Sequence, residues 1–274
     1  MVQGLSINTN VGAMTALEQL NATNKKLNTT QLRITTGLKV NGPKDDASTF
    51  AIAQRLRGDI AGTQAVKIAL ANGESTVNVA ISAGKAIANL LTEMKAKVVQ
   101  ANQAGLDSAS RTALHNDFTS LRDQLNTIVA TAEFNNVNLI SSGASTITVL
   151  STVDGSTITV SAQPMSSTTL ALHTATLTSS AGAATALTLI DSAITLVADK
   201  LAALGSSAKR IEVQNDFTTS LINILTEGLG NLVDADLAEE SARLQSFQIQ
   251  QQLGVQSLAI ANAGPQAILA LFQG

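Results

Sequence analysis

The sequence predicts a mainly α-helical protein, built of long antiparallel, coiled-coil-like helical rods with a small β-hairpin region in the middle. The first observation is a heptad repeat in the second half, where mostly apolar residues recur at four-three spacing from Ile190 to Leu232. The second is a seven-residue repeat in the first half, from Leu56 to Val98. Such repeats mark the face along which one long helix packs on another. The third is the scarcity of proline, with only 3 residues to interrupt a helix.

The two repeats define a seam that should run along the rods. Its members share one face of their helix, so burial against a partner helix is expected for all of them. The seam residues on which we rely are Leu70, Val77, Leu91, Ile194, Leu201, Ile211, Ile222 and Leu229.

Breaks in the helical pattern divide the chain into three parts. Gly37, Gly42 and Pro43 end an amphipathic helix near the N-terminus, and acidic residues open the next one. We expect terminal helices at 1–42 and 233–274, and a helical rod domain at 43–140 and 185–232. Laying the halves antiparallel brings both termini to one end and makes the middle project from the other.

The middle segment, 141–184, has a different composition. About half of its residues are Ser or Thr, and its sole formal charge is Asp154. Two β-branched runs, TITVL at 146–150 and TITV at 157–160, flank Asp154-Gly155. Asp-Gly between such runs favours a β-hairpin, which we expect to face outward into solvent. The hydroxyls fit a solvated β surface or sites for O-linked sugar.

Composition excludes several classes of function. The net charge of -3 offers no basic surface for nucleic acid or an anionic membrane. With no Cys, there are no disulfides, thiolate metal sites or thiol nucleophiles. The N-terminus lacks the basic and apolar regions of a signal peptide. The uncharged residues 244–274 contain recurring Gln and Asn, which are costly in lipid, so no membrane insertion is expected.

No residue pattern predicts catalysis, a cofactor or a metal site. His115 and Asp117 lie two positions apart on a helix and therefore point in different directions, which favours exposed polar residues over a catalytic pair. His173 lies in the middle segment without a second ligand nearby. Asp45-Asp46 could be imagined as a cation site, but without further spaced oxygens a helix start is the better interpretation.

Several motifs resemble those of one family, bacterial flagellin. LSINTN at 5–10 is similar to its opening, and RITTGLKVN followed by KDDA, at 33–41 and 44–47, resembles its Arg-Leu-Ser-Ser-Gly-Leu-Arg-Ile-Asn and Lys-Asp-Asp-Ala signature. FNNV at 134–137 resembles a Phe-Asn-Gly motif. DADLAEES at 234–241 and QAILALF at 266–272 resemble motifs near the other end.

This resemblance implies a structural subunit that polymerises, alone or with other flagellins, into the extracellular filament used for swimming. It implies secretion by the flagellar type III export apparatus and contacts with an export chaperone, the filament cap and hook-junction proteins. The large outer domains of many flagellins are absent here. A hook-filament junction protein of the same family is the alternative. A secreted enzyme on a flagellin scaffold would need a longer middle with more titratable groups.

The terminal helices are the expected polymerisation surface. The resemblance places them in the inner filament layer, and their partly polar seam buries too little apolar area to offset the cost of ordering the chain. Neighbouring subunits must supply the rest. The residues expected to make these contacts are Leu5, Ile7, Val11, Leu17, Leu20, Leu27, Ile34, Leu244, Phe247, Leu253, Leu258, Ile260, Leu269 and Phe272.

Overall fold

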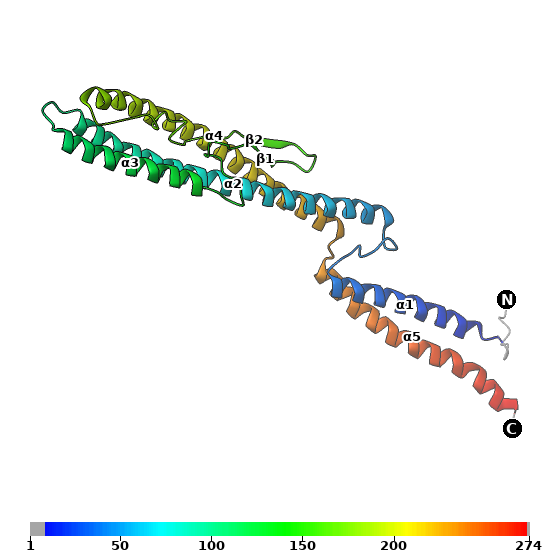
Figure 1. Cartoon of the computed structure of the whole chain (residues 1–274). Coiled ribbons are helices and arrows are strands. Elements are labelled where there is room, and N and C mark those ends of the chain that lie inside the picture. The colour runs from blue at the N-terminus through cyan, green and yellow to red at the C-terminus, as the bar shows by residue number, and fades with distance from the viewer. Residues whose placement is uncertain (1–8, 273–274) are drawn as a thin grey trace. The chain divides into compact units, whose positions relative to one another are not determined.

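The computed structural model describes residues 9–272, with side chains described as far as residue 263. Its elements are α1 (Val11–Thr36), α2 (Ala47–Ala101), α3 (Ser108–Thr131), β1 (Ile147–Leu150), β2 (Thr157–Val160), α4 (Ser180–Val233) and α5 (Leu237–Phe272) (Figure 1). Long helices with one small antiparallel sheet confirm the predicted fold class.

The chain divides into two compact units. The terminal unit comprises Met1–Gly58 and Leu225–Gly274, and the rod unit comprises Asp59–Ile224. These boundaries fall inside α2 and α4, whereas the sequence placed them near 42 and 233. The start of α2 joins the terminal unit because Ala53 is buried in a small cluster with Val40 and Val233.

Two adjacent carboxylates shape the chain before α2. Asp46 accepts hydrogen bonds from the hydroxyls and backbone N–H groups of Ser48 and Thr49. The bonds from Thr49, followed by those from Ser48, lower the pKa of Asp46 to about 2. Asp45 accepts from the N–H groups of Asn41 and Gly42. Both carboxylates therefore serve the loop and the helix start, as the sequence predicted.

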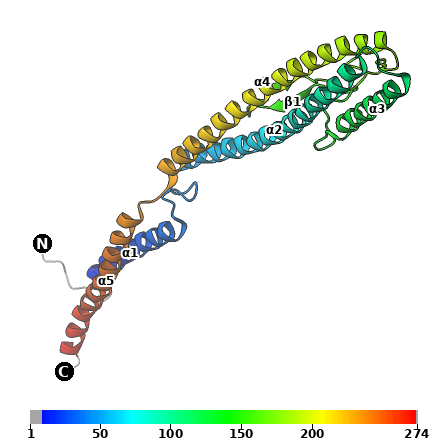
Figure 2. The same ribbon diagram turned by 90° about the vertical axis from the view of Figure 1, so that its left-hand side faces the viewer.

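In the rod unit, α2 and α4 pack antiparallel. Lys95 of α2 forms an ion pair with Asp191 near the start of α4, at 2.7 Å, and Gly84 lies against Leu201 further along it. Both views show the two helices side by side (Figures 1 and 2). Of the seam residues, the structure fully buries Leu70, Val77, Leu91 and Ile211 and half-buries Ile194, Leu201 and Ile222.

Leu229 does not lie in the rod seam, where the heptad repeat predicted it. It packs, half-buried, against the Val40–Ala53–Val233 cluster of the terminal unit instead of joining the rod core. Lys39 and Val40 donate backbone hydrogen bonds to the carbonyl of Val233, at the end of α4, and so hold this end of the helix in the terminal unit. A repeat in the sequence gives the period of a helix but not the partner that it meets.

Helix α3 packs antiparallel on the end of α2. Lys97 of α2 pairs with Asp117 of α3 at 2.7 Å. Arg111, which is 8% exposed, donates to the carbonyls of Ala101 and Gln103 just where α2 ends. The guanidinium N–H groups of Arg111 satisfy carbonyl groups that have no partner within the helix. Its positive charge also lies favourably at the negative end of the helix dipole.

The predicted hairpin is present. Strands β1 and β2 pair antiparallel, with Ile147 opposite Val160 and Leu150 opposite Thr157. Asp154 and Gly155 lie in a longer turn than the bare dipeptide implies, since Ser151 N–H donates to the carbonyl of Ser156. Gly155 has φ of 90°, a value that favours glycine.

The expectation that the middle segment projects and faces solvent is wrong for one of its faces. Val149, Ile158 and Val160 are buried in the rod core, and so are Met165, Leu170, Leu172 and Leu177 of the following segment. The hairpin lies along the rod, with Val149 against Gly73 of α2 and Ser151 accepting from Gln214 of α4. The apolar residues alternate with Ser and Thr, so average composition conceals a continuous buried face.

Gly73 provides the space for this packing. An alanine Cβ there would lie 2.5 Å from a methyl carbon of Val149. We expect Gly73→Ala to destabilise the rod unit by about 1 to 3 kcal/mol, despite the better helix propensity of alanine, because the core is overpacked.

Gly205 of α4 is the matched control, because a Cβ added there would meet nothing within 4 Å. Gly205→Ala should instead stabilise the protein by about 1 kcal/mol. Urea unfolding followed by circular dichroism measures both. Equal effects of the two substitutions would contradict the placement of the hairpin on α2.

Candidate assembly surface

Helices α1 and α5 of the terminal unit form an antiparallel pair (Figures 1 and 2). Three polar contacts fix their register. Arg33 bonds to Glu240 at 2.9 Å, Gln251 donates to the side-chain oxygen of Asn24 at 2.7 Å, and Asn10 donates to the carbonyl of Ala261 at 2.7 Å. The contacts are spread along α1, so the two helices run together over most of its length.

The interior of this pair is small and largely polar. In α1, the fully buried residues are Thr23, Leu27 and Thr30. In the part of α5 whose side chains are described, the sole fully buried residue is Glu240. A pair whose interior holds a single large apolar side chain gains little from the hydrophobic effect.

Glu240 is the most buried ionisable group of the pair, at 4% exposed. Burial acts to raise the pKa of its carboxyl group, but the hydrogen bond and positive charge of Arg33, aided by Thr30 and the charge of Arg243, outweigh burial and lower it. Both arginines bond to the same oxygen, Oε1. The Nε of Arg33 and the Oε2 of Glu240 are buried without a hydrogen-bond partner of standard geometry.

The outer faces of the pair expose many apolar side chains. Of the predicted polymerisation residues, the structure leaves Val11, Leu17, Leu253 and Ile260 exposed, half-buries Leu20, Ile34, Leu244, Phe247 and Leu258, and fully buries Leu27. Leu5 and Ile7 lie outside the described residues, as do the side chains of Leu269 and Phe272.

Sequence reasoning missed a second set of exposed apolar residues on the same helices. The heptad pattern selects residues that face the intramolecular partner, so it passes over those that face away. A count of apolar residues on the remaining faces of each helix would have found them. They are Met14, Leu32, Leu237, Ile249 and Val255. Apolar surface this extensive is typical of an interaction site.

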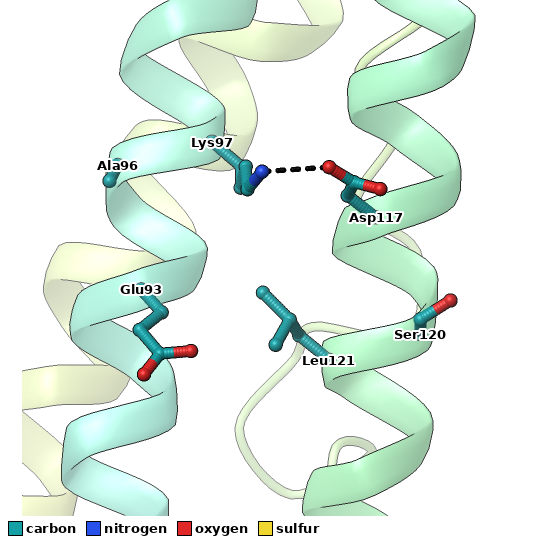
Figure 3. A pocket seen from close by; sticks show the side chains of 6 residues that line it. All are labelled: Glu93, Ala96, Lys97, Asp117, Ser120 and Leu121. Atoms are coloured by element: carbon teal, nitrogen blue, oxygen red, sulfur yellow. Dashed lines mark hydrogen bonds and ion pairs between the residues drawn. The ribbon is translucent and has the colours of Figure 1, made fainter.

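A groove of about 450 Å³ between α2 and α3 is one alternative place for chemistry (Figure 3). It is lined by Glu93, Lys97 and Asp117, and its central feature is the Lys97–Asp117 ion pair. His115 faces elsewhere, with its Nδ1 3.4 Å from the backbone N–H of Leu177, from which it accepts a hydrogen bond. His115 and Asp117 therefore have separate structural partners. Among described residues, no cluster of His, Asp or Glu could hold a metal ion.

By length and composition, α4 is the one described helix apolar enough to cross a membrane. Its apolar stripe, however, includes Ile190, Val197 and Ile211, which are buried in the rod core. Asp191 of the same helix pairs with Lys95. Packing within the rod therefore accounts for part of the high hydropathy of α4.

Comparison with known proteins decides whether the chain serves assembly, chemistry or membrane insertion. The bacterial flagellin N-terminal helical region matches residues 7–145, and the C-terminal helical region matches 187–272. Flagellin FljK of Caulobacter vibrioides is 45% identical over 269 residues, covering 98% of each chain. Flagellin C of Rhizobium meliloti is 33% identical over 321 residues, covering 98% of this chain and 99% of the relative.

The chain belongs to the flagellin family.

As a flagellin, the chain is a structural subunit that polymerises into the bacterial flagellar filament, and it is not an enzyme. The matched regions leave out 146–186, which holds the hairpin and the buried segment after it. The match over nearly the full length of relatives such as FljK also confirms a short form without large outer domains.

Solved structures agree with this fold. A crystal structure of Bacillus cereus flagellin has a TM-score of 0.50 and 22% identity, covering 54% of this chain and 86% of that chain. A protein described as flagellar hook-associated, from Vibrio parahaemolyticus, has a TM-score of 0.59 and 14% identity, covering 69% and 100%. At such identities the likeness shows the fold alone. Because the full-length sequence relatives are flagellins, a hook-filament junction protein is not favoured.

The buried carboxylate of Glu240 should make pairing of α1 with α5 sensitive to acid. Its pKa is lower in the folded pair than in the unfolded chain, so its stabilisation is present above the ordinary glutamate pKa. That stabilisation is lost as the pH falls through the lowered pKa. We expect Glu240→Gln to reduce helicity at neutral pH and to flatten its dependence on acid, measured by circular dichroism of the monomer.

Glu239→Gln is the matched control, because Glu239 is exposed and pairs with Arg243 at the surface. Exposed ion pairs contribute about 0 to 1 kcal/mol, so this variant should behave like the native chain. A Glu240→Gln monomer with the native acid profile would show that the buried pair does not hold the helices together.

Proposed function

We propose that α1 and α5 make the principal contacts between subunits in the filament. One observation carries the proposal: the exposed apolar residues of these helices surround an interior that contains only Leu27 as a fully buried large apolar side chain among the described residues. Burying those faces against neighbouring subunits would supply the hydrophobic stabilisation that the isolated pair lacks. Folding of the terminal unit is then completed by assembly.

In this proposal the rod unit and its hairpin form the outer part of the subunit. The rod unit has its own continuous core, to which α2, α3, the hairpin region and α4 all contribute. It can therefore fold without neighbours. The turn at Asp154 and Gly155 is exposed and polar, which suits a surface that meets solvent.

Leu253→Asp tests the assembly surface. Leu253 is 56% exposed in the single chain, so a carboxylate there costs the monomer little, but it would lie unpaired in a subunit contact. We expect a monomer of native helicity whose critical concentration for polymerisation rises at least about tenfold, a change of about 1.4 kcal/mol. Sedimentation of the polymer measures it.

Val99→Asp is the control for this substitution. Val99 is 48% exposed, but it lies near the end of α2 in the rod unit. The same chemical change there should leave polymerisation unaltered. Native assembly by Leu253→Asp would refute the proposed surface, and deletion of 253–274 should abolish assembly for the same reason.

A short epitope inserted between Asp154 and Gly155 tests the outward position of the hairpin. Exposed turns usually tolerate insertion, so filaments should form and bind the antibody along their length. Antibody that binds the tagged monomer but not the filament would contradict an outward-facing hairpin.

We further propose that the chain leaves the cell through the flagellar type III export apparatus, with an export chaperone, and joins the filament beneath its cap after hook-junction proteins. The scant interior of the α1–α5 pair supports this, because a unit of low stability is easily kept unfolded for passage. The uncharged residues 244–274 would also pass a narrow channel without trapping by charge. Cells that lack the export apparatus should retain the protein, and its release from such cells would contradict this route.

A further inference from the structure

The terminal unit carries two separate charged patches of opposite sign. The first, which we call the basic notch, is a hollow of about 290 Å³ between α1 and α5. Its wall also includes Thr29, Thr30 and Phe247. Its cationic side chains are Lys25, Lys26, Arg33 and Arg243.

The positive charges of the basic notch are only partly neutralised within the chain. Glu240 and Glu239 pair with Arg33 and Arg243. Lys25 and Lys26 are exposed and have no ion pair among the described residues. The buried Nε of Arg33 also lacks an acceptor. The basic notch therefore carries more positive than negative charge, and it lies beside the aromatic ring of Phe247.

The second patch, which we call the acidic collar, consists of carboxylates in the two segments that connect α1 to α2 and α4 to α5. Backbone bridging between Leu38 and Asp234, and a bond from Ala235 N–H to the carbonyl of Gly37, hold the two segments together. The carboxylates of the collar outnumber the two nearby lysines, Lys39 and Lys44. They are Asp45, Asp46, Asp234 and Asp236.

Asp234 is the collar residue freest to act outside the chain. Asp45, Asp46 and Asp236 already accept backbone hydrogen bonds in a loop or at helix starts. The carboxylate of Asp234 is exposed and has no ion pair or hydrogen bond among the described residues. Its charge is therefore available to a partner.

We propose that the basic notch of one subunit receives the acidic collar of a neighbouring copy of this chain, and that this contact sets the register between subunits. It rests on the proposed role of α1 and α5 in assembly. An open polymer is built from heterologous contacts, in which two different surfaces of the subunit meet. The notch and collar are two such surfaces, and they are complementary in charge.

The remaining surface of the pair cannot set the register by itself. Residues 244–263 of α5 carry no charge, and the exposed Leu253, Val255 and Ile260 can slide along an apolar neighbour at little cost. Charged contacts suppress such alternatives, because a slipped register places like charges together or leaves a charge unpaired. Every subunit in a polymer also presents its collar at high local concentration, which favours a second copy over a free anion.

A double-mutant cycle with the full chain tests the contact. Lys26→Glu and Asp234→Lys each reverse one exposed charge, so both monomers should keep native helicity. Each substitution should raise the critical concentration at least about threefold, and the combined variant should return toward the native value, since the reversed charges attract again. Asp154→Lys, at the hairpin turn, is the control for charge reversal and should assemble normally.

The other outcomes would overturn the proposal in distinguishable ways. If both single variants assemble poorly and the combination is worse still, the two patches do not meet, although α1 and α5 can still form the contact. If Lys26→Glu alone impairs assembly, the notch serves a different acidic partner. If neither charge reversal changes the critical concentration while Leu253→Asp blocks assembly, the subunits meet through the apolar surface of α1 and α5 and the proposed charged contact does not exist.

Discussion

The incomplete interior of the α1–α5 pair is the constraint on which the rest of this structure depends. Two helices bury only the narrow stripe along which they touch, and here that stripe holds Thr23, Leu27, Thr30 and Glu240. The remaining apolar side chains face outward. Under the proposed function, neighbouring subunits cover these side chains and complete the core of the terminal unit, which would tie its stability to polymerisation.

The rod unit is organised in the opposite way. The seam along α2 and α4 is covered by α3 over one stretch and by the hairpin over another, so that Phe118, Val149 and Leu172 join one continuous core. Glycines at 62 and 73 of α2 let the hairpin approach closely. In the proposed account, the rod unit folds within the single chain, whereas the terminal unit gains most of its stability from assembly.

The regular part of this fold could be predicted from the sequence. The repeat through Leu70, Val77 and Leu91 identified buried positions of α2, and the β-branched runs around Asp154-Gly155 identified both strands. These features are local, so they can be predicted from the periodicity of a short stretch of sequence. The flagellin motifs indicated the family, and comparison with known proteins confirmed it.

Long-range pairing could not be predicted in the same way. Nothing near Glu240 in the sequence indicates Arg33 as its partner, and the match between Val149 and Gly73 depends on two segments far apart in the chain. Serine and threonine around Val149 also concealed its buried face. The exposed Met14 and Ile249 escaped notice because the heptad repeat describes only the face that meets a partner within the chain.

Amide hydrogen exchange of the monomer, compared with the assembled filament, is the most direct test of the central claim. The account predicts that amides of α1 and α5 exchange rapidly in the monomer and become strongly protected in the filament, while those in the core of α2 and α4 are protected in both. Equal protection of α1 and α5 in the two states would mean that the terminal pair is already complete without its neighbours, and would contradict the account.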